Sequence, residues 1–268
     1  MNKFMLALAL GTGLTLSLAV PSVQADTIQS LTPADMSASQ FNSLFTPLAG
    51  SLPSNSPFSF NNLPVSGSVL SQVFQGSGAA AGLYAYAYQF AVNNVTNSSG
   101  NTPFVDSAGW QFNSTPVGTD LTGTGHTTYG YVVTNGQVGG LVPPVASSGE
   151  TIAVPTSLSW QPGTTSAQLR VGYVDPTTQT GPVGAGANSA TFVVLSSQPP
   201  SSSYVSLQGE GPIVFDPSSG GMLAQVYAPQ NGVIAPIPVP EPATFLAWAG
   251  MAGAVALVRR VRKNRVAF

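Results

Sequence analysis

The stretch from Leu83 to Val92 reads LYAYAYQFAV, and it decides how the rest of the chain is interpreted. Aromatic rings recur at every second position from Tyr84 to Phe90, and small or polar residues take the positions between them. Because successive side chains of a β-strand point to opposite faces, this period of two is typical of a strand. We expect its aromatic face to pack into a core. The alternative is an exposed row of tyrosines (Tyr84, Tyr86 and Tyr88) that binds sugar or a partner.

Other short segments downstream have the same strand character, and turn-forming pairs separate them, such as Asn135-Gly136 and Gly181-Pro182. The candidate strands are Trp110–Asn113, Thr127–Thr134, Thr151–Trp160, Ala167–Val174, Ala190–Ser196, Tyr204–Gln208, Pro212–Phe215 and Met222–Tyr227. Many short strands without a long helical period predict an all-β protein built as a β-sandwich. Jelly-roll and immunoglobulin-like topologies both fit this pattern.

Composition shifts suggest how the chain is divided. We predict an irregular lead-in over residues 26–82, the sandwich over 83–228 and an extended Pro-rich spacer over 229–239. Within the lead-in we expect one short helix, capped by Thr32 with Pro33 in its first turn. Residues 76–82, GSGAAAG, are expected to be a linker ahead of the sandwich.

Charge is distributed unevenly along the 268 residues. Residues 26–240 hold one cation, Arg170, against eight carboxylates, a formal charge of −7. Nucleic-acid binding needs cations that replace counterions along the phosphates, so a nucleic-acid partner is not expected. The chain has no cysteine, which excludes zinc-thiolate sites, iron–sulfur clusters and cysteine nucleophiles.

The N-terminal residues 1–25 have the layout of a secretory signal peptide. Lys3 is followed by an apolar run that Pro21 ends, and small residues at Val23 and Ala25 precede the expected cleavage point before Asp26. An N-terminal membrane anchor is the alternative, but the apolar run is short for a spanning helix. We therefore expect an exported protein whose fold begins near Asp26.

The C-terminal residues 240–268 have the layout of a membrane stop signal. Residues 243–258 are an uncharged run of 16 residues, somewhat short of the roughly 20 that a spanning helix takes. Basic residues follow at once, and their long stems can extend the span by reaching the interface. These residues are Arg259, Arg260, Arg262, Lys263 and Arg265. Because such charges stay cytoplasmic, residues 26–240 are expected outside the membrane.

The tripeptide Pro240-Glu241-Pro242 stands directly before the apolar run. Its two prolines favour an extended backbone at Glu241, which suits a protease cleft. The whole stretch VPEPATFLAWAGMAGAVALVRRVRKNR, residues 239–265, resembles the PEP-CTERM sorting signal of Gram-negative and related bacteria. The resemblance implies that an exosortase processes the chain near Glu241. It also implies a surface or matrix protein in an organism that makes exopolysaccharide.

Residues that could support catalysis or metal binding are few. His126 is the only histidine, and the sequence around it lacks the strand–elbow–helix context of a serine-hydrolase triad. Asp175 and Asp216 each begin an Asp-Pro stretch that we interpret as a turn rather than as a calcium ligand set. Two carboxylates of a glycosidase are not excluded, but no spacing favours them. We therefore expect no catalytic residues and no cofactor.

Together these patterns predict a non-enzymatic exported protein of the cell surface or extracellular matrix, held in the membrane until an exosortase processes it. Exopolysaccharide is a candidate partner. Two alternatives remain. One is a carbohydrate-binding or glycan-hydrolysing sandwich that uses the tyrosine row together with Trp110 and Trp160. The other is a plain membrane-anchored periplasmic protein.

Overall fold

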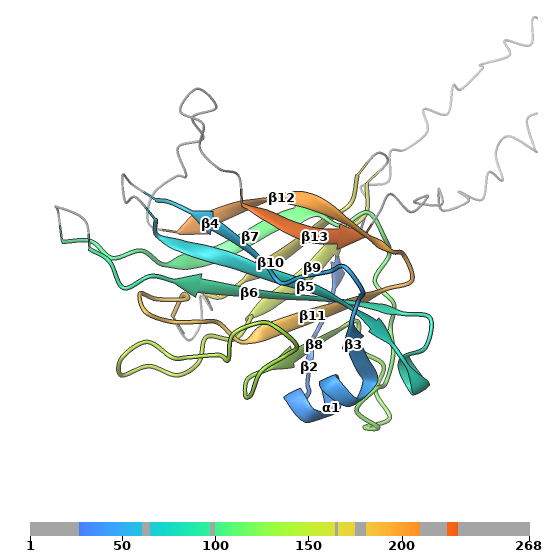
Figure 1. The fold of residues 1–268 in the computed structure, drawn as a ribbon. Helices are drawn as coiled ribbons and strands as arrows, with labels where there is room; N and C mark the ends of the chain where they lie inside the picture. Colours follow the sequence, from blue (N-terminus) through green and yellow to red (C-terminus); the bar gives the residue numbers. More distant parts are fainter. Residues whose placement is uncertain are drawn as a thin grey trace, which may run out of the picture.

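The computed structural model describes residues 27–60, 65–96, 100–163, 166–174, 181–209 and 224–229. Within these residues the chain forms two β-sheets with very little helix (Figure 1). The prediction of an all-β protein is therefore confirmed. The strand expected at Pro212–Phe215 lies outside the described residues, as do the expected signal peptide and the residues after Pro229.

The first sheet has six strands, and every neighbouring pair in it is antiparallel. In spatial order its strands are β1 (Gln29–Ser30), β9 (Ser157–Gln161), β10 (Gln168–Gly172), β7 (Val105–Gln111), β12 (Pro200–Gly209) and β13 (Gln225–Pro229). Pro229, expected to begin the spacer, instead ends β13, where it pairs with Pro200.

The second sheet has seven strands, and its one parallel pair is β2 with β8. In spatial order its strands are β2 (Ala34–Asp35), β8 (Gly130–Val133), β11 (Thr191–Ser196), β6 (Tyr84–Val92), β5 (Gly67–Gly76) and β3 (Phe45–Pro47), and β4 (Ser54–Phe58) also pairs with β5. From β6 to β9 the chain alternates between the two sheets. It then returns so that β10 pairs with β7 and β11 pairs with β6.

The predicted boundary at residues 82 and 83 is wrong. Strand β5 lies before it and pairs with β6 over nine residue pairs, so the lead-in supplies a central strand of the sheet. The expected linker is only the connection between these two strands, with a short 3₁₀ turn, η1 (Gly78–Ala80). Strand β5 was missed because all its residues from Val69 to Phe74 are buried, on both faces of the sheet. A strand buried on both faces shows no alternation of apolar and polar residues.

The main core lies between the two sheets. Tyr88 of the seven-stranded sheet meets Trp110 of the six-stranded sheet at 4.6 Å between ring centroids, and Tyr86 meets Phe112 at 5.5 Å. Each buried tyrosine hydroxyl donates a 2.8 Å hydrogen bond to a backbone oxygen, that of Gln198 for Tyr86 and that of Tyr227 for Tyr88. The aromatic face of residues 83–92 therefore holds the two sheets together.

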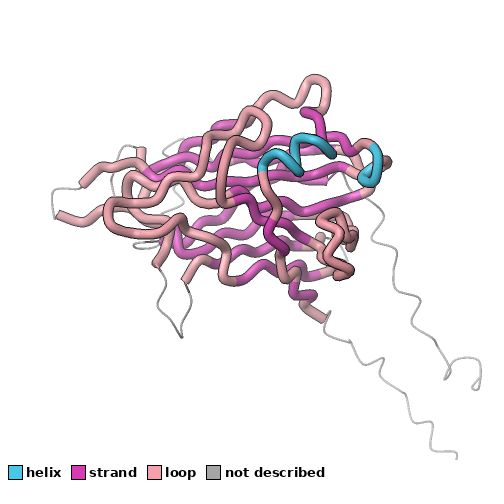
Figure 2. Tube along the Cα trace, turned by 90° about the horizontal axis from the view of Figure 1, so that it is seen from below, coloured by secondary structure: helices cyan, strands magenta, loops and turns pink. Residues whose placement is uncertain are grey.

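A second, smaller core covers the opposite face of the seven-stranded sheet. The small residues of β6 that alternate with the tyrosines, Ala85 and Ala87, lie in it. Helix α1 (Ala38–Leu44) also contributes, because Phe41 packs edge-on against Phe74 of β5 at 4.9 Å. Figure 2, seen from below, shows the helix lying across the strands on this side. The seven-stranded sheet is therefore covered on both faces.

Helix α1 begins later than predicted. Its cap is Ser37, whose hydroxyl accepts the Gln40 backbone N–H, while the Gln40 side chain accepts the Ser37 backbone N–H. This reciprocal capping box satisfies two backbone donors at once. The helix cannot start at Pro33 because Ala34 and Asp35 are extended and pair with β8.

Candidate functional site

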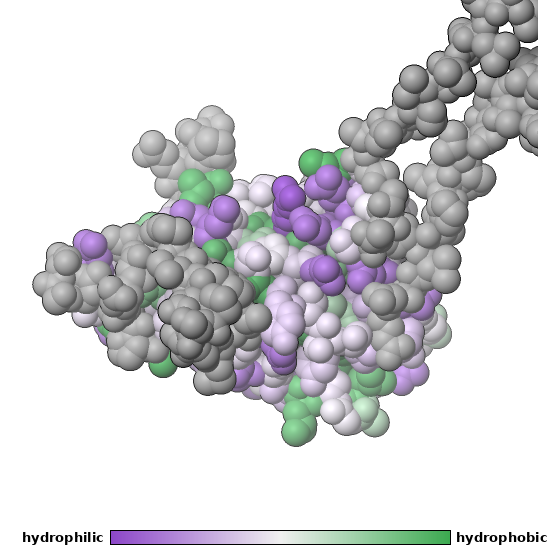
Figure 3. All heavy atoms as spheres, turned by 90° about the horizontal axis from the view of Figure 1, so that it is seen from above, coloured by the Kyte–Doolittle hydropathy of each residue, from purple (hydrophilic) through white to green (hydrophobic). Residues whose placement is uncertain are grey.

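The outer face of the six-stranded sheet is the candidate site, because its polar side chains point away from the core. In β10 the residues Gln168 and Arg170 are exposed, whereas Leu169 and Val171 between them are buried. The strand register aligns Arg170 with Ser159 on one side and with Gly109 on the other. Gly109 is in turn aligned with Ser206 of β12. Figure 3 views the molecule from the side on which β12 and β13 lie in Figure 1, and hydrophilic residues are prominent there.

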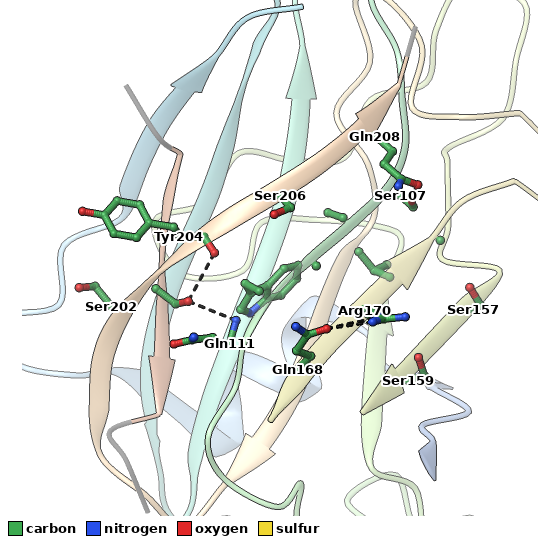
Figure 4. Close-up of a pocket in the computed structure, with 16 residues that line it drawn as sticks. Ser107, Gln111, Ser157, Ser159, Gln168, Arg170, Ser202, Tyr204, Ser206 and Gln208 are labelled. Carbon is green, nitrogen blue, oxygen red and sulfur yellow. Dashed lines mark hydrogen bonds between the residues drawn. The ribbon is translucent and has the colours of Figure 1, made fainter. Parts of the chain in front are cut away.

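This face is hollowed into a trough of about 940 Å³. Besides Ala108, Trp110 and Val171, the residues that line it are Ser107, Gly109, Gln111, Ser157, Ser159, Gln168, Arg170, Gly172, Ser202, Ser203, Tyr204, Ser206 and Gln208. The trough crosses the sheet from β9, with Ser157 and Ser159, to β12, where Tyr204 marks the other end (Figure 4). Three interstrand spacings separate these ends, a span of about 14 Å. Gly109 keeps the floor low because it has no side chain.

Arg170 is the one cation in the trough and the only Lys or Arg in residues 4–258. Its Nε and Nη2 atoms donate to the Oε1 atom of Gln168 at 3.3 and 2.9 Å (Figure 4). That acceptor is a neutral amide, so the hydrogen bonds orient the guanidinium without cancelling its charge. None of the described residues that line the trough is acidic.

The remaining polar groups of the trough hold one another in place. The Ser107 hydroxyl donates to Gln208 Oε1 at 2.9 Å, and the Gln111 backbone N–H donates to Ser203 Oγ at 3.2 Å. Hydroxyl and amide groups can both donate and accept, so the surface offers either kind of partner to a ligand. Tyr204 is exposed over 56% of its surface and presents an accessible ring.

The tyrosine row predicted as an alternative binding surface is not exposed. Tyr86 and Tyr88 are fully buried between the sheets, and Trp110 and Trp160 are also buried. Trp160 donates its indole N–H to the Phe112 backbone oxygen at 2.9 Å. Sugar stacking needs an accessible ring face, so these residues cannot provide it. The aromatic residues that carried that alternative belong to the core.

His126 lies on an exposed loop, next to a turn that Asp120 organises. The Asp120 carboxylate accepts the backbone N–H groups of Thr124 at 3.1 Å and Gly125 at 2.7 Å. Slight desolvation raises the pKa of Asp120, but these backbone hydrogen bonds outweigh it and hold the pKa below its usual value. Among the described residues no cluster of three or more His, Asp or Glu forms a metal site. Asp175 and Asp216 lie outside those residues.

The sequence-predicted sorting residues also lie outside the part of the chain that the structure describes. They are Ala25 and Asp26 at the N-terminal cleavage point, Pro240, Glu241 and Pro242, and the basic residues Arg259, Arg260, Arg262, Lys263 and Arg265. The described helices are too short to cross a bilayer, and the span expected at residues 243–258 is not among them. These expectations therefore stay predictions.

Comparison with protein-family models, with curated proteins and with solved structures found no match for the chain. Sequence reasoning missed the trough, although it placed strands over Trp110–Asn113, Ala167–Val174 and Tyr204–Gln208. The available signal was the strict alternation in QLRVG, residues 168–172, which puts Arg170 on the face opposite Leu169 and Val171.

Asp106, in β7, makes folding stability depend on pH. Burial raises its pKa, so the folded state binds this proton more tightly than the unfolded state does. The stabilisation that comes from protonated Asp106 is therefore fully present below the unfolded pKa of about 3.9. It is lost as pH rises through the pKa of Asp106 in the folded state. We expect Asp106→Asn to raise the melting temperature relative to the unsubstituted protein more at pH 7 than at pH 3. Thermal unfolding at both pH values measures this, and an equal difference would contradict it.

Proposed function

We propose that this chain is an exported, non-enzymatic protein of the cell surface or extracellular matrix. The observation that carries the proposal is the order of signals in one sequence. Residues 1–25 have the layout of a signal peptide, and the Pro240-Glu241-Pro242 motif, an apolar run and five cations follow the folded body. Translocation would stop at the cations and leave the motif at the outer face of the inner membrane. An exosortase is the proposed processing enzyme.

We infer that the folded body is a β-sandwich of jelly-roll type rather than of immunoglobulin type. The support is its nested pairing, in which β6 pairs with β11 and β7 pairs with β10. Strands β8 and β9 then join the outer sides of β11 and β10. A chain that alternates between two sheets and retraces its path in this way follows the double-sheet pattern of jelly rolls.

The intact mass of the mature protein from its native host tests the sorting proposal. We expect a product that begins at Asp26 and ends near Glu241 in the extracellular fraction. Glu241→Ala should instead leave a product that carries Arg265 in the membrane. Pro236→Ala, a change in the spacer outside the motif, should be processed normally.

Two outcomes would contradict this proposal. If the unsubstituted protein retains Arg265 in the membrane, the tail is an ordinary anchor and the chain is a membrane-anchored periplasmic protein. If Glu241→Ala is cleaved as efficiently as Pro236→Ala, the tripeptide is not the recognition element.

A further inference from the structure

We propose that the trough on the six-stranded sheet is a binding site for a polysaccharide that carries carboxylate groups, such as a chain of uronic acids. The inference rests on the proposed function, because it assumes that the folded body lies among surface polysaccharides.

The polar groups of the trough suit a sugar chain. A sugar presents hydroxyl groups that donate and accept hydrogen bonds, and serine hydroxyl and glutamine amide groups do the same. Ser159 and Ser206 lie in one row across the floor with Arg170, and Gln111 and Gln168 lie beside that row. The exposed ring of Tyr204 gives a sugar ring a stacking surface at one end.

The charge of the trough favours a carboxylate on that sugar. The guanidinium of Arg170 presents planar donors that match a carboxylate, and only a neutral amide now accepts from it. The body as a whole is acidic, but charges farther than about 8 Å from the Arg170 guanidinium are largely screened at physiological ionic strength. Because no described residue lining the trough is acidic, the local charge is that of Arg170.

Other classes of ligand fit less well. A peptide that adds a strand to a sheet binds at an edge, whereas the trough lies on a face. Protein interfaces have apolar and aromatic residues at their centres, and the centre of this trough is Arg170 among serine and glutamine side chains. A nucleic acid would need several cations along its phosphates, and only one is present.

The test is calorimetric titration of the purified protein with oligogalacturonate and with the same oligosaccharide after reduction of its carboxyl groups. We expect the oligogalacturonate to bind about tenfold more tightly than its neutral counterpart. Arg170→Gln should abolish this preference, and Arg170→Lys should keep part of it. Tyr204→Ala should weaken the binding of both oligosaccharides alike, because stacking on the ring does not depend on the carboxylate.

Gln137→Glu is the matched control. It lowers the net charge by one, as Arg170→Gln does, but Gln137 is exposed beside α1, where its backbone oxygen accepts from Asn42. That position lies over the other sheet, so binding should be unchanged. Three results would overturn the proposal. Arg170→Gln and Gln137→Glu could lose equal affinity for oligogalacturonate, or the unsubstituted protein could bind both ligands equally or bind neither. A protein that binds but keeps its tail would contradict only the sorting proposal, and a processed protein that does not bind would contradict only the trough.

Discussion

Replacing Phe192 by alanine is expected to lower the free energy of unfolding by roughly 3–5 kcal/mol, the usual cost of emptying a buried phenylalanine site. Phe192 is 0% exposed in β11. Its ring centroid lies 5.4 Å from that of Tyr88 in the seven-stranded sheet and 6.0 Å from that of Trp110 in the six-stranded sheet, so Phe192 packs against both sheets. Folded domains are stable by about 5–15 kcal/mol, so this loss would remove much of the stability.

Tyr204→Ala is the control for this substitution. It also replaces an aromatic ring by a methyl group, but Tyr204 is exposed, and surface changes usually alter stability by about 0.5 kcal/mol or less. Urea denaturation followed by tryptophan fluorescence measures the unfolding of this part of the core, because Trp110 lies beside Phe192. Equal costs for the two substitutions would show that the sheets do not pack over Phe192.

The central aromatic strand could be predicted from sequence because its alternation survives in the fold. Strand β6 has large aromatic residues on the side of the thick core between the sheets, and alanine on the side covered by α1 and loops. The two faces therefore need residues of different size, and a period of two remains visible. Strand β5 buries one polar residue among apolar ones on each face, Ser71 on one and Gln72 on the other, so its sequence shows no such period.

The trough could be predicted only in part, because it depends on strand register. Alternation within β10 places Arg170 outside, but Ser159, Gly109 and Ser206, which share its row across the sheet, lie 11, 61 and 36 residues from it in the chain. No local propensity specifies such pairing; it follows from which buried faces fit together. Local sequence also left open whether the tyrosine row, Trp110 and Trp160 form an exposed binding face. Their burial depends on a second sheet that the local sequence does not reveal.

The second large effect is expected at Gly76, the last residue of β5. A Cβ atom added there would overlap the backbone carbonyl and the Cβ of Ala80 in the η1 turn. That turn cannot easily move away, because Ala80 is fully buried, its N–H donates to Ser77 and its oxygen accepts from Leu83. Overpacking of this kind costs typically 1–3 kcal/mol and occasionally more, so we expect Gly76→Ala to destabilise the protein by about 3 kcal/mol.

Gly109→Ala makes the same chemical change where there is room for it. Its added Cβ would lie 3.5 Å from the Leu169 oxygen and 3.6 Å from Arg170 Cγ, which are ordinary contacts. Because alanine also loses less backbone entropy on folding, this variant should be as stable as the unsubstituted protein or slightly more stable. Urea denaturation of the two variants side by side separates the close approach at Gly76 from a general cost of replacing strand glycines. A Gly76→Ala protein as stable as Gly109→Ala would mean that the β5–β6 connection yields to the added methyl group, and that its tight turn does not constrain how these two central strands pair.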